Sequence, residues 1–103
     1  MLKTKIQQIN KAAQGRRFRR GLGARIVRSR QRRGWSQEKL ADRLDVGRER
    51  LAKWEVGRHA PPAEALLALS EVLEMTVDEL LTGRRLNLPH PDGAEASERS
   101  IEK

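Results

Sequence analysis

The sequence predicts an all-α fold, a compact domain of five helices with flexible ends. Apolar residues recur about every three or four positions in several segments, as along the buried face of a helix. Helix-capping residues such as Ser36 and Thr76 precede two of these segments, and glycine or proline follows several of them. Because 103 residues have room for about one domain, we expect it at residues 21–82, with a basic arm at 1–20 and a disordered tail at 83–103.

The first two helices are expected after the arm. The arm itself should contain at most a short, marginal helix before Gly15, followed by a flexible arginine cluster. A first helix is predicted between Gly21 and Gly34, because glycine commonly follows the last helical residue. Ser36 is a favourable N-cap for a second helix of about two turns. The inward residues of these helices are Leu22, Ile26, Leu40, Ala41 and Leu44.

A third helix follows almost at once, between Gly47 as its N-cap and Gly57 as its end. At about 100° per residue, one arc of this helix should pack and the other should face outward. Two short helices joined by a tight turn, the second displaying long polar side chains, form the arrangement in which a helix enters the major groove of DNA. The packing arc holds Leu51, Trp54 and Glu55, and the outward arc holds Arg48, Glu49, Ala52, Lys53 and Val56.

The fourth and fifth helices follow two prolines. Pro61 and Pro62 are expected to start the fourth helix. Thr76 and Glu79 have the spacing of a capping box, which predicts a short fifth helix ending before Gly83. The fourth helix should bury a broad face composed of Leu66, Leu67, Leu69, Val72 and Leu73.

Positive charge is concentrated in the first third of the chain. Residues 1–35 hold twelve Lys or Arg and no acidic residue, whereas residues 36–83 hold six against ten. The net charge of +8 therefore belongs to the N-terminal part. Such a cluster is typical of a protein that binds a polyanion, nucleic acid or anionic lipid, although a solvated disordered segment has the same composition.

Several other kinds of site are not expected. The chain has no cysteine and two histidines, and its carboxylates do not cluster, so we predict no metal site, no cofactor and no enzymatic activity. No apolar run approaches the length of about 18 residues that indicates a membrane span. We therefore expect a cytoplasmic protein without a membrane partner. Trp35 and Trp54 are predicted to be core residues rather than stacking platforms for bases.

Two long strings in the chain resemble a known family. These are "RSRQRRGWSQEKLADRLDVGRERLAKWEVGR" at 28–58 and "PPAEALLALSEVLEMTVDELL" at 61–81. In order and spacing, they are similar to the phage-repressor-like Cro/CI helix-turn-helix family, also called the xenobiotic-response-element family. The resemblance covers about residues 21–82 and implies a lambda-repressor-like DNA-binding domain of five helices.

The resemblance also implies roles for individual residues. Arg48, Glu49 and Lys53 match the positions whose side chains reach base edges, and Ala52 can touch a thymine methyl group. Phosphate contacts are implied for Gln37, at the start of the second helix, and expected for Arg50, Arg58 and, in the arm, Arg17 and Arg19. Arg30 and Glu55 match a pair that forms a structural salt bridge between the first and third helices.

The sequence departs from the family pattern at four positions. Asp45 and Glu74 stand where glycine is usual, so we expect Asp45 to adopt a left-handed conformation if the turn is kept. Gly47 replaces the usual Ser or Thr cap, and Ser29 replaces a core aliphatic residue.

The implied function is that of a sequence-specific DNA-binding transcriptional regulator, a repressor that binds double-stranded DNA as a homodimer. Three alternatives remain open. A similar domain occurs in antitoxins, which repress their own operon and bind a toxin partner. It also occurs in controller proteins of restriction-modification systems and in bridging adaptors that contact the transcription machinery. The candidate dimer surface consists of Leu80, Leu81, Leu86 and Leu88.

Overall fold

The computed structural model describes residues 5–84, with side chains from residue 11 onward. This part of the chain contains five helices and no strand, which confirms the predicted all-α class. The helices are α1 (Lys5–Arg32), α2 (Gln37–Leu44), α3 (Arg48–Glu55), α4 (Ala63–Leu73) and α5 (Val77–Thr82).

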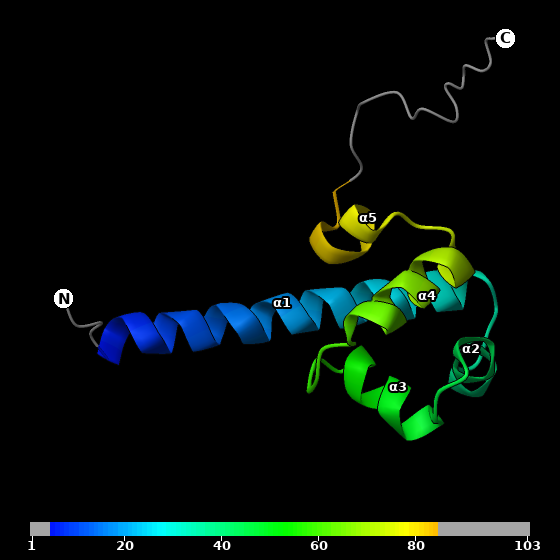
Figure 1. The fold of residues 1–103 in the computed structure, drawn as a ribbon, viewed down its shortest axis with the longest axis horizontal. Coiled ribbons are helices and arrows are strands. Elements are labelled where there is room, and N and C mark those ends of the chain that lie inside the picture. Colours follow the sequence, from blue (N-terminus) through cyan, green and yellow to red (C-terminus); the bar gives the residue numbers. More distant parts are fainter. Residues whose placement is uncertain (1–4, 85–103) are drawn as a thin grey trace, which may run out of the picture.

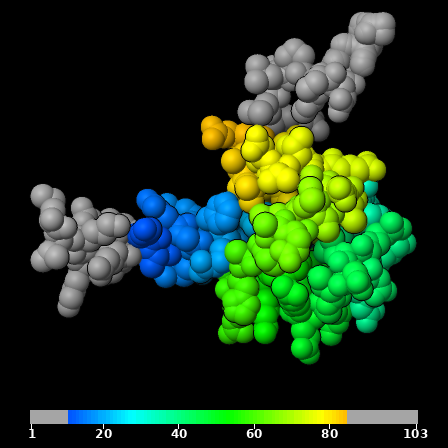
Figure 2. Space-filling view, in the orientation of Figure 1, coloured from blue at the N-terminus to red at the C-terminus, as the bar shows by residue number. Residues whose placement is uncertain are grey.

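The long helix α1 is the axis of the domain. Figure 1 shows α5 on one side of its C-terminal half and α3 on the other, so α1 separates these two short helices. Its N-terminal half extends beyond the body of the domain, as the space-filling view also shows (Figures 1 and 2). No helix in the described part combines the length and the apolar character needed to cross a membrane.

The predicted start of the first helix at Gly21 is wrong. Residues 5–20, expected as a flexible arm with at most a short helix, belong to α1, which runs on through both Gly21 and Gly23. Glycine inside a helix costs about 1 kcal/mol relative to alanine, which is why the sequence favoured a boundary there. At Gly23, however, a Cβ would overlap the carbonyl oxygens of Trp54 and Glu55. Gly23 is therefore a point of close contact with α3 inside a continuous helix.

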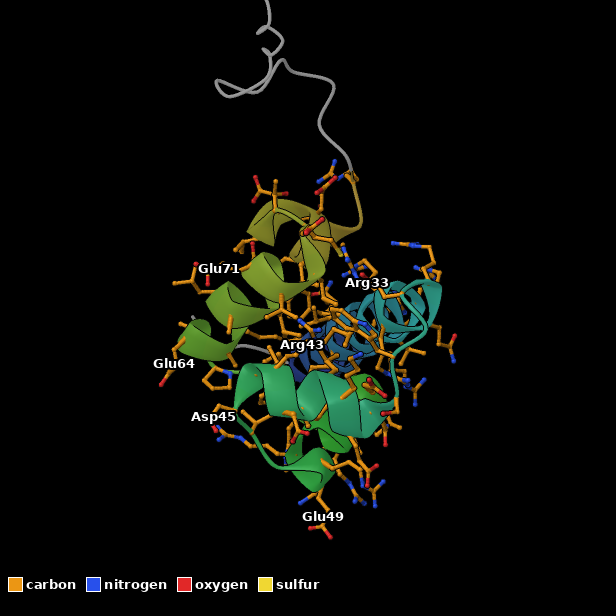
Figure 3. All side chains as sticks on the ribbon, turned by 90° about the vertical axis from the view of Figure 1, so that its right-hand side faces the viewer. Arg33, Arg43, Asp45, Glu49, Glu64 and Glu71 are labelled. Atoms are coloured by element: carbon orange, nitrogen blue, oxygen red, sulfur yellow. The ribbon has the colours of Figure 1, made fainter. Side chains whose placement is uncertain are left out.

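The core draws side chains from all five helices. It consists of Leu22, Ile26, Leu40, Ala41, Leu44, Leu51, Trp54, Ala65, Leu69, Leu73 and Leu80. The predicted face of α4 is partly wrong, because Leu67 is 57% exposed. Glu64 and Glu71, one turn before and after Leu67, point away from the domain in Figure 3. Leu80 is fully buried, so it is not available for the expected dimer surface. Leu86 and Leu88 lie outside the described residues.

Most helix ends are those that the sequence predicts. Thr76 and Glu79 form both hydrogen bonds of the capping box at the start of α5. Gly34 and Gly57 end α1 and α3 with positive φ angles of 72° and 81°. Asp45 adopts the expected left-handed conformation, and Glu74 does the same at the end of α4, each with φ 56°. A left-handed conformation costs a non-glycine residue about 1–2 kcal/mol, so the packing of α2 and α4 on the core must offset this cost.

Candidate nucleic-acid interface

The turn between α2 and α3 is sharp because it consists of only three residues, Asp45, Val46 and Gly47. The Asp45 N–H donates to the carbonyl oxygen of Asp42 (3.1 Å) and the Val46 N–H to that of Ala41 (3.0 Å), which closes the end of α2. Val46 packs against the core, and Gly47 is the extended N-cap of α3. The left-handed Asp45 thus redirects the chain, and Val46 fixes the new direction by packing its partly buried side chain against the core.

The outward arc of α3 is assembled as its helical spacing predicts. Arg48, Glu49 and Lys53 are exposed, and Ala52 is half-buried between them. These residues, with Val56 and Arg58, line a shallow groove of about 380 Å³, which we call the reading groove. Figure 3 shows Glu49 at the outer tip of α3, pointing away from the domain. Among the described residues no ion pair joins Glu49 to Lys53.

The opposite arc of α3 is fixed by a buried carboxylate. Arg30 of α1 donates from Nε to Glu55 Oε2 (2.7 Å) and from Nη2 to Glu55 Oε1 (3.1 Å). The Glu55 side chain is only 3% exposed, and burial of a carboxylate is costly unless it is paired in this way. The third nitrogen, Arg30 Nη1, donates to the Trp35 carbonyl (2.9 Å). The pair therefore ties α1, the loop that follows it, and α3 together.

Gln37 joins the same network, a contact that the sequence did not predict. Its Nε2 donates to Glu55 Oε1 (2.7 Å), and its Oε1 accepts from Arg48 Nη1 (3.4 Å). A glutamine amide carries two N–H donors, and the contact with Glu55 needs only one of them. The other donor stays compatible with the predicted phosphate contact. Gln37 thereby connects the buried carboxylate to the outward arc of α3.

The remaining phosphate candidates come from two elements. The exposed Arg50 lies over the Trp54 ring, with 5.4 Å from its Cζ to the ring centroid, and Arg58 lines the reading groove. In α1, Arg19 donates from Nε to the Gly57 carbonyl (3.2 Å), which brings the protruding half of α1 against the end of α3. Arg17 is exposed, but it stands two positions from Arg19, so the helix turns it toward a different side.

The structure indicates one further cation that the sequence analysis did not single out. Arg16 is exposed and stands three positions before Arg19, so these two arginines share a face of α1. That face is the one that meets the end of α3. The shared face of Arg16 and Arg19 exists only because residues 16–20 belong to the continuous helix α1. In a flexible arm, two residues three positions apart would have no fixed relation.

The described part of the chain offers no alternative site for metal chemistry. Within it no group of three His, Cys, Asp or Glu residues is arranged to hold a metal ion. His59 is exposed in the loop after α3, and His90 lies outside the described residues.

Comparisons with known proteins identify relatives that regulate transcription. A family profile described as Helix-turn-helix (HTH_3) matches residues 26–80. The HTH-type transcriptional activator BcrR of Enterococcus faecalis is 43% identical over 51 residues, which are 50% of this chain and 25% of that protein. A prophage-derived uncharacterized HTH-type transcriptional regulator, YonR, of Bacillus subtilis (strain 168) is 36% identical over 61 residues, 59% of this chain and 56% of that protein. The chain thus spans only part of the length of these relatives.

A solved structure shows the same fold. A chain of the SinR protein/SinI protein complex aligns with a TM-score of 0.57 and 24% sequence identity, covering 79% of each chain. The family profile covers more than half of the chain, from Ile26 in α1 to Leu80 in α5. The chain therefore belongs to the helix-turn-helix family of Cro/CI-like proteins, the xenobiotic-response-element type.

Proposed function

We propose that the protein is a sequence-specific DNA-binding transcriptional regulator, a repressor that reads the major groove with α3. The observation that carries this proposal is the reading groove, where exposed Arg48, Glu49 and Lys53 flank the smaller Ala52. An α-helix fits the major groove of B-DNA, where base edges present distinct donor and acceptor patterns. A protein bound over a promoter can repress transcription by excluding the polymerase from the same DNA.

The side chains of the reading groove fit particular base edges. Arg48 and Lys53 favour the O6 and N7 acceptors of guanine, and Glu49 accepts from the amino group of cytosine. Ala52 and Val56 offer methyl groups to the methyl of thymine. The Glu55 network supports this reading, because it holds α3 at a fixed angle on α1. Gln37, Arg50, Arg58, Arg19 and Arg17 would then contact phosphates and set the register of α3 in the groove.

We further propose that the protein binds as a homodimer. A single short helix reads too few base pairs for useful specificity, and two copies on a palindromic site double the number read. Half-sites about one helical turn apart, roughly 34–36 Å, would place both copies of α3 on the same side of the duplex.

The test is selection of binding sites from a random duplex library with the full chain at about 150 mM salt, where nonspecific phosphate attraction is already weakened. We expect a palindromic consensus that contains guanine and cytosine at the positions opposite Arg48, Glu49 and Lys53. Failure to enrich any sequence would overturn base reading by α3. It would favour a bridging adaptor, or an antitoxin that binds DNA only with its toxin partner.

A further inference from the structure

A second basic site lies on the side of α1 that faces away from α3. Between α1 and the turn from α4 to α5 lies a pocket of about 610 Å³ that is open to solvent, which we call the arginine cavity. Four arginines line it: Arg25, Arg28 and Arg32 of α1, and Arg33 directly after that helix. Because α5 and α3 lie on opposite sides of α1 (Figure 1), this cavity is separate from the reading groove.

Two of these arginines are hydrogen-bonded to backbone carbonyls of the cavity wall. Arg25 donates from Nε to the Leu80 carbonyl (2.6 Å) and from Nη2 to the Leu81 carbonyl (2.7 Å), near the end of α5. Arg33, labelled in Figure 3, donates from Nη2 to the Leu73 carbonyl (2.6 Å) at the end of α4. These bonds fix both guanidinium groups, so a ligand would not have to order them. Fixed donors lose less entropy on binding than mobile ones.

The other two arginines supply donors that the fold does not use. Arg28 and Arg32 are exposed, and within residues 11–84 their guanidinium groups form no hydrogen bond or ion pair. Two acidic residues also line the cavity, but both are engaged. Glu74 lies 3.7 Å from Arg33, and Glu79 accepts from the Thr76 N–H at 2.9 Å. The lining of the cavity therefore holds four cations and two carboxylates, and its net charge is positive.

Burial and the neighbouring positive charge both act on Arg25. Burial, together with the neighbouring charge of Arg28, lowers the pKa of Arg25 from its ordinary value. Both causes disfavour the charged form, and the opposite charge of an anion in the cavity would offset them. Gly83 leaves space beside the Nη1 atom of Arg25, because a Cβ at residue 83 would stand 3.0 Å from that atom. Gly83 has a φ of 74°, which glycine adopts without strain.

The cavity is not purely polar. The half-buried Met75 lines it beside the arginines, whereas the side chain of Leu73 lies in the core beneath. Its volume falls in the range of about 300–1,000 Å³ that is typical of small-molecule sites. Guanidinium groups match the oxygens of carboxylate and of phosphate with two parallel hydrogen bonds. Of the two kinds, an anion with several phosphate groups carries more charge per volume, which suits a cavity lined by four arginines.

We propose that the arginine cavity binds a small anion with two or more phosphate groups. The phosphates lie between Arg28, Arg32 and Arg25, and any organic group attached to them lies against Met75. Such a ligand can be bound while α3 is on DNA, because the two sites are on opposite sides of α1. The proposal does not depend on DNA binding, since each site can be assayed without the other.

The test uses inorganic tripolyphosphate and adenosine triphosphate as probes on the full chain, at constant ionic strength and without DNA. Backbone amide NMR shifts in the unmodified protein should move at residues 25–33 and 73–83 and stay unchanged at 48–58. Movement confined to 48–58, or no movement, would overturn the proposal. Tighter binding of the nucleotide than of tripolyphosphate indicates an organic phosphate that uses the apolar wall, and equal binding indicates recognition of phosphate alone; both support the site.

Matched variants test the assignment of the arginines. The double variant Arg28→Gln and Arg32→Gln should weaken binding of both probes by about tenfold or more, since it removes two charge-assisted contacts. The control Lys11→Gln and Lys39→Gln removes the same number of charges from exposed positions outside both the cavity and the reading groove. Its affinity for both probes should stay within about twofold of that of the unmodified protein. Equal weakening in the two double variants would show that only the overall charge attracts the anion, and the proposal would fail.

Discussion

At the scale of single residues, sequence position and structural role agree best on the outward arc of α3. Arg48, Glu49 and Lys53 were grouped by helical periodicity alone, and they line one groove in the structure. Their agreement is expected, because the period of a helix is a local property of the backbone. Glu55 and Gln37 differ in this respect: their contact joins residues 18 positions apart, and it requires the packed domain.

Lys53→Ala tests base reading at one position. Alanine is a strong helix former, so α3 should persist while the ammonium group is lost. We expect a cost of about 1–3 kcal/mol on the selected site and a relaxed preference at one base position. The measurement is affinity for a panel of duplexes that vary one base pair at a time.

Lys39→Ala is the control for this substitution. Lys39 is an exposed lysine of α2 outside the reading groove, so its loss should leave the order of preference among the duplexes unchanged. An unchanged order with Lys53→Ala as well would remove Lys53 from the reading residues.

At the scale of elements, α1 departs most from the expectation from sequence. Glycines at 15 and 21 favour a break, yet the helix is continuous from Lys5 to Arg32. Packing decides this, because Gly23 lets the backbone of α1 approach the end of α3, and Arg19 bonds the Gly57 carbonyl beyond it. Helix propensity is a weak preference that such tertiary contacts override.

Gly15→Ala and Gly23→Ala test the continuity of α1 with the same chemical change. At Gly15 a new Cβ would meet only Arg19 Nη1 at 3.3 Å, the mobile end of a side chain. We expect greater helicity by circular dichroism and a gain of about 0.5–1 kcal/mol in the free energy of unfolding. At Gly23 the Cβ overlaps backbone carbonyls of α3, so we expect a loss of about 1–3 kcal/mol. Equal effects at the two sites would contradict the continuous, packed helix.

Glu55→Gln tests the tie between α1 and α3. Neutralising this buried carboxylate leaves the Arg30 guanidinium, whose side chain is 12% exposed, without a counter-charge. We expect a loss of about 3 kcal/mol in the free energy of unfolding by denaturant. Glu74→Gln is the matched control, since Glu74 is 78% exposed and 3.7 Å from Arg33, and it should change stability by less than about 0.5 kcal/mol. A similar small loss for Glu55→Gln would mean that packing alone orients α3.

At the scale of the whole molecule, α1 separates two basic surfaces. Arg16 and Arg19 share the face of α1 that meets α3, whereas Arg25, Arg28 and Arg32 line the cavity toward α5. The charge that the sequence presents as one cluster is therefore divided between two sides. Under the proposed function, only the first group lies toward DNA.

Arg16→Gln and Arg32→Gln test this division. Each phosphate contact contributes about 0.9 to the slope of the logarithm of affinity against the logarithm of salt concentration. We expect Arg16→Gln to lower this slope by about 0.9 without changing the preferred sequence, and Arg32→Gln to leave it unaltered. The measurement is a salt titration of binding to the selected duplex. A lower slope for both variants would mean that both sides of α1 attract DNA.

The sequence by itself determined where most helices end and which arc of α3 faces outward. Caps such as Thr76 with Glu79, and the left-handed residue Asp45, act through hydrogen bonds to their own neighbours, so a short window of sequence contains them. The tertiary structure alone decided the extent of α1, the exposure of Leu67 and the division of the arginines between two sides. Each of these depends on contacts between segments distant in the chain, and their free energy outweighs local preference only after the domain has packed.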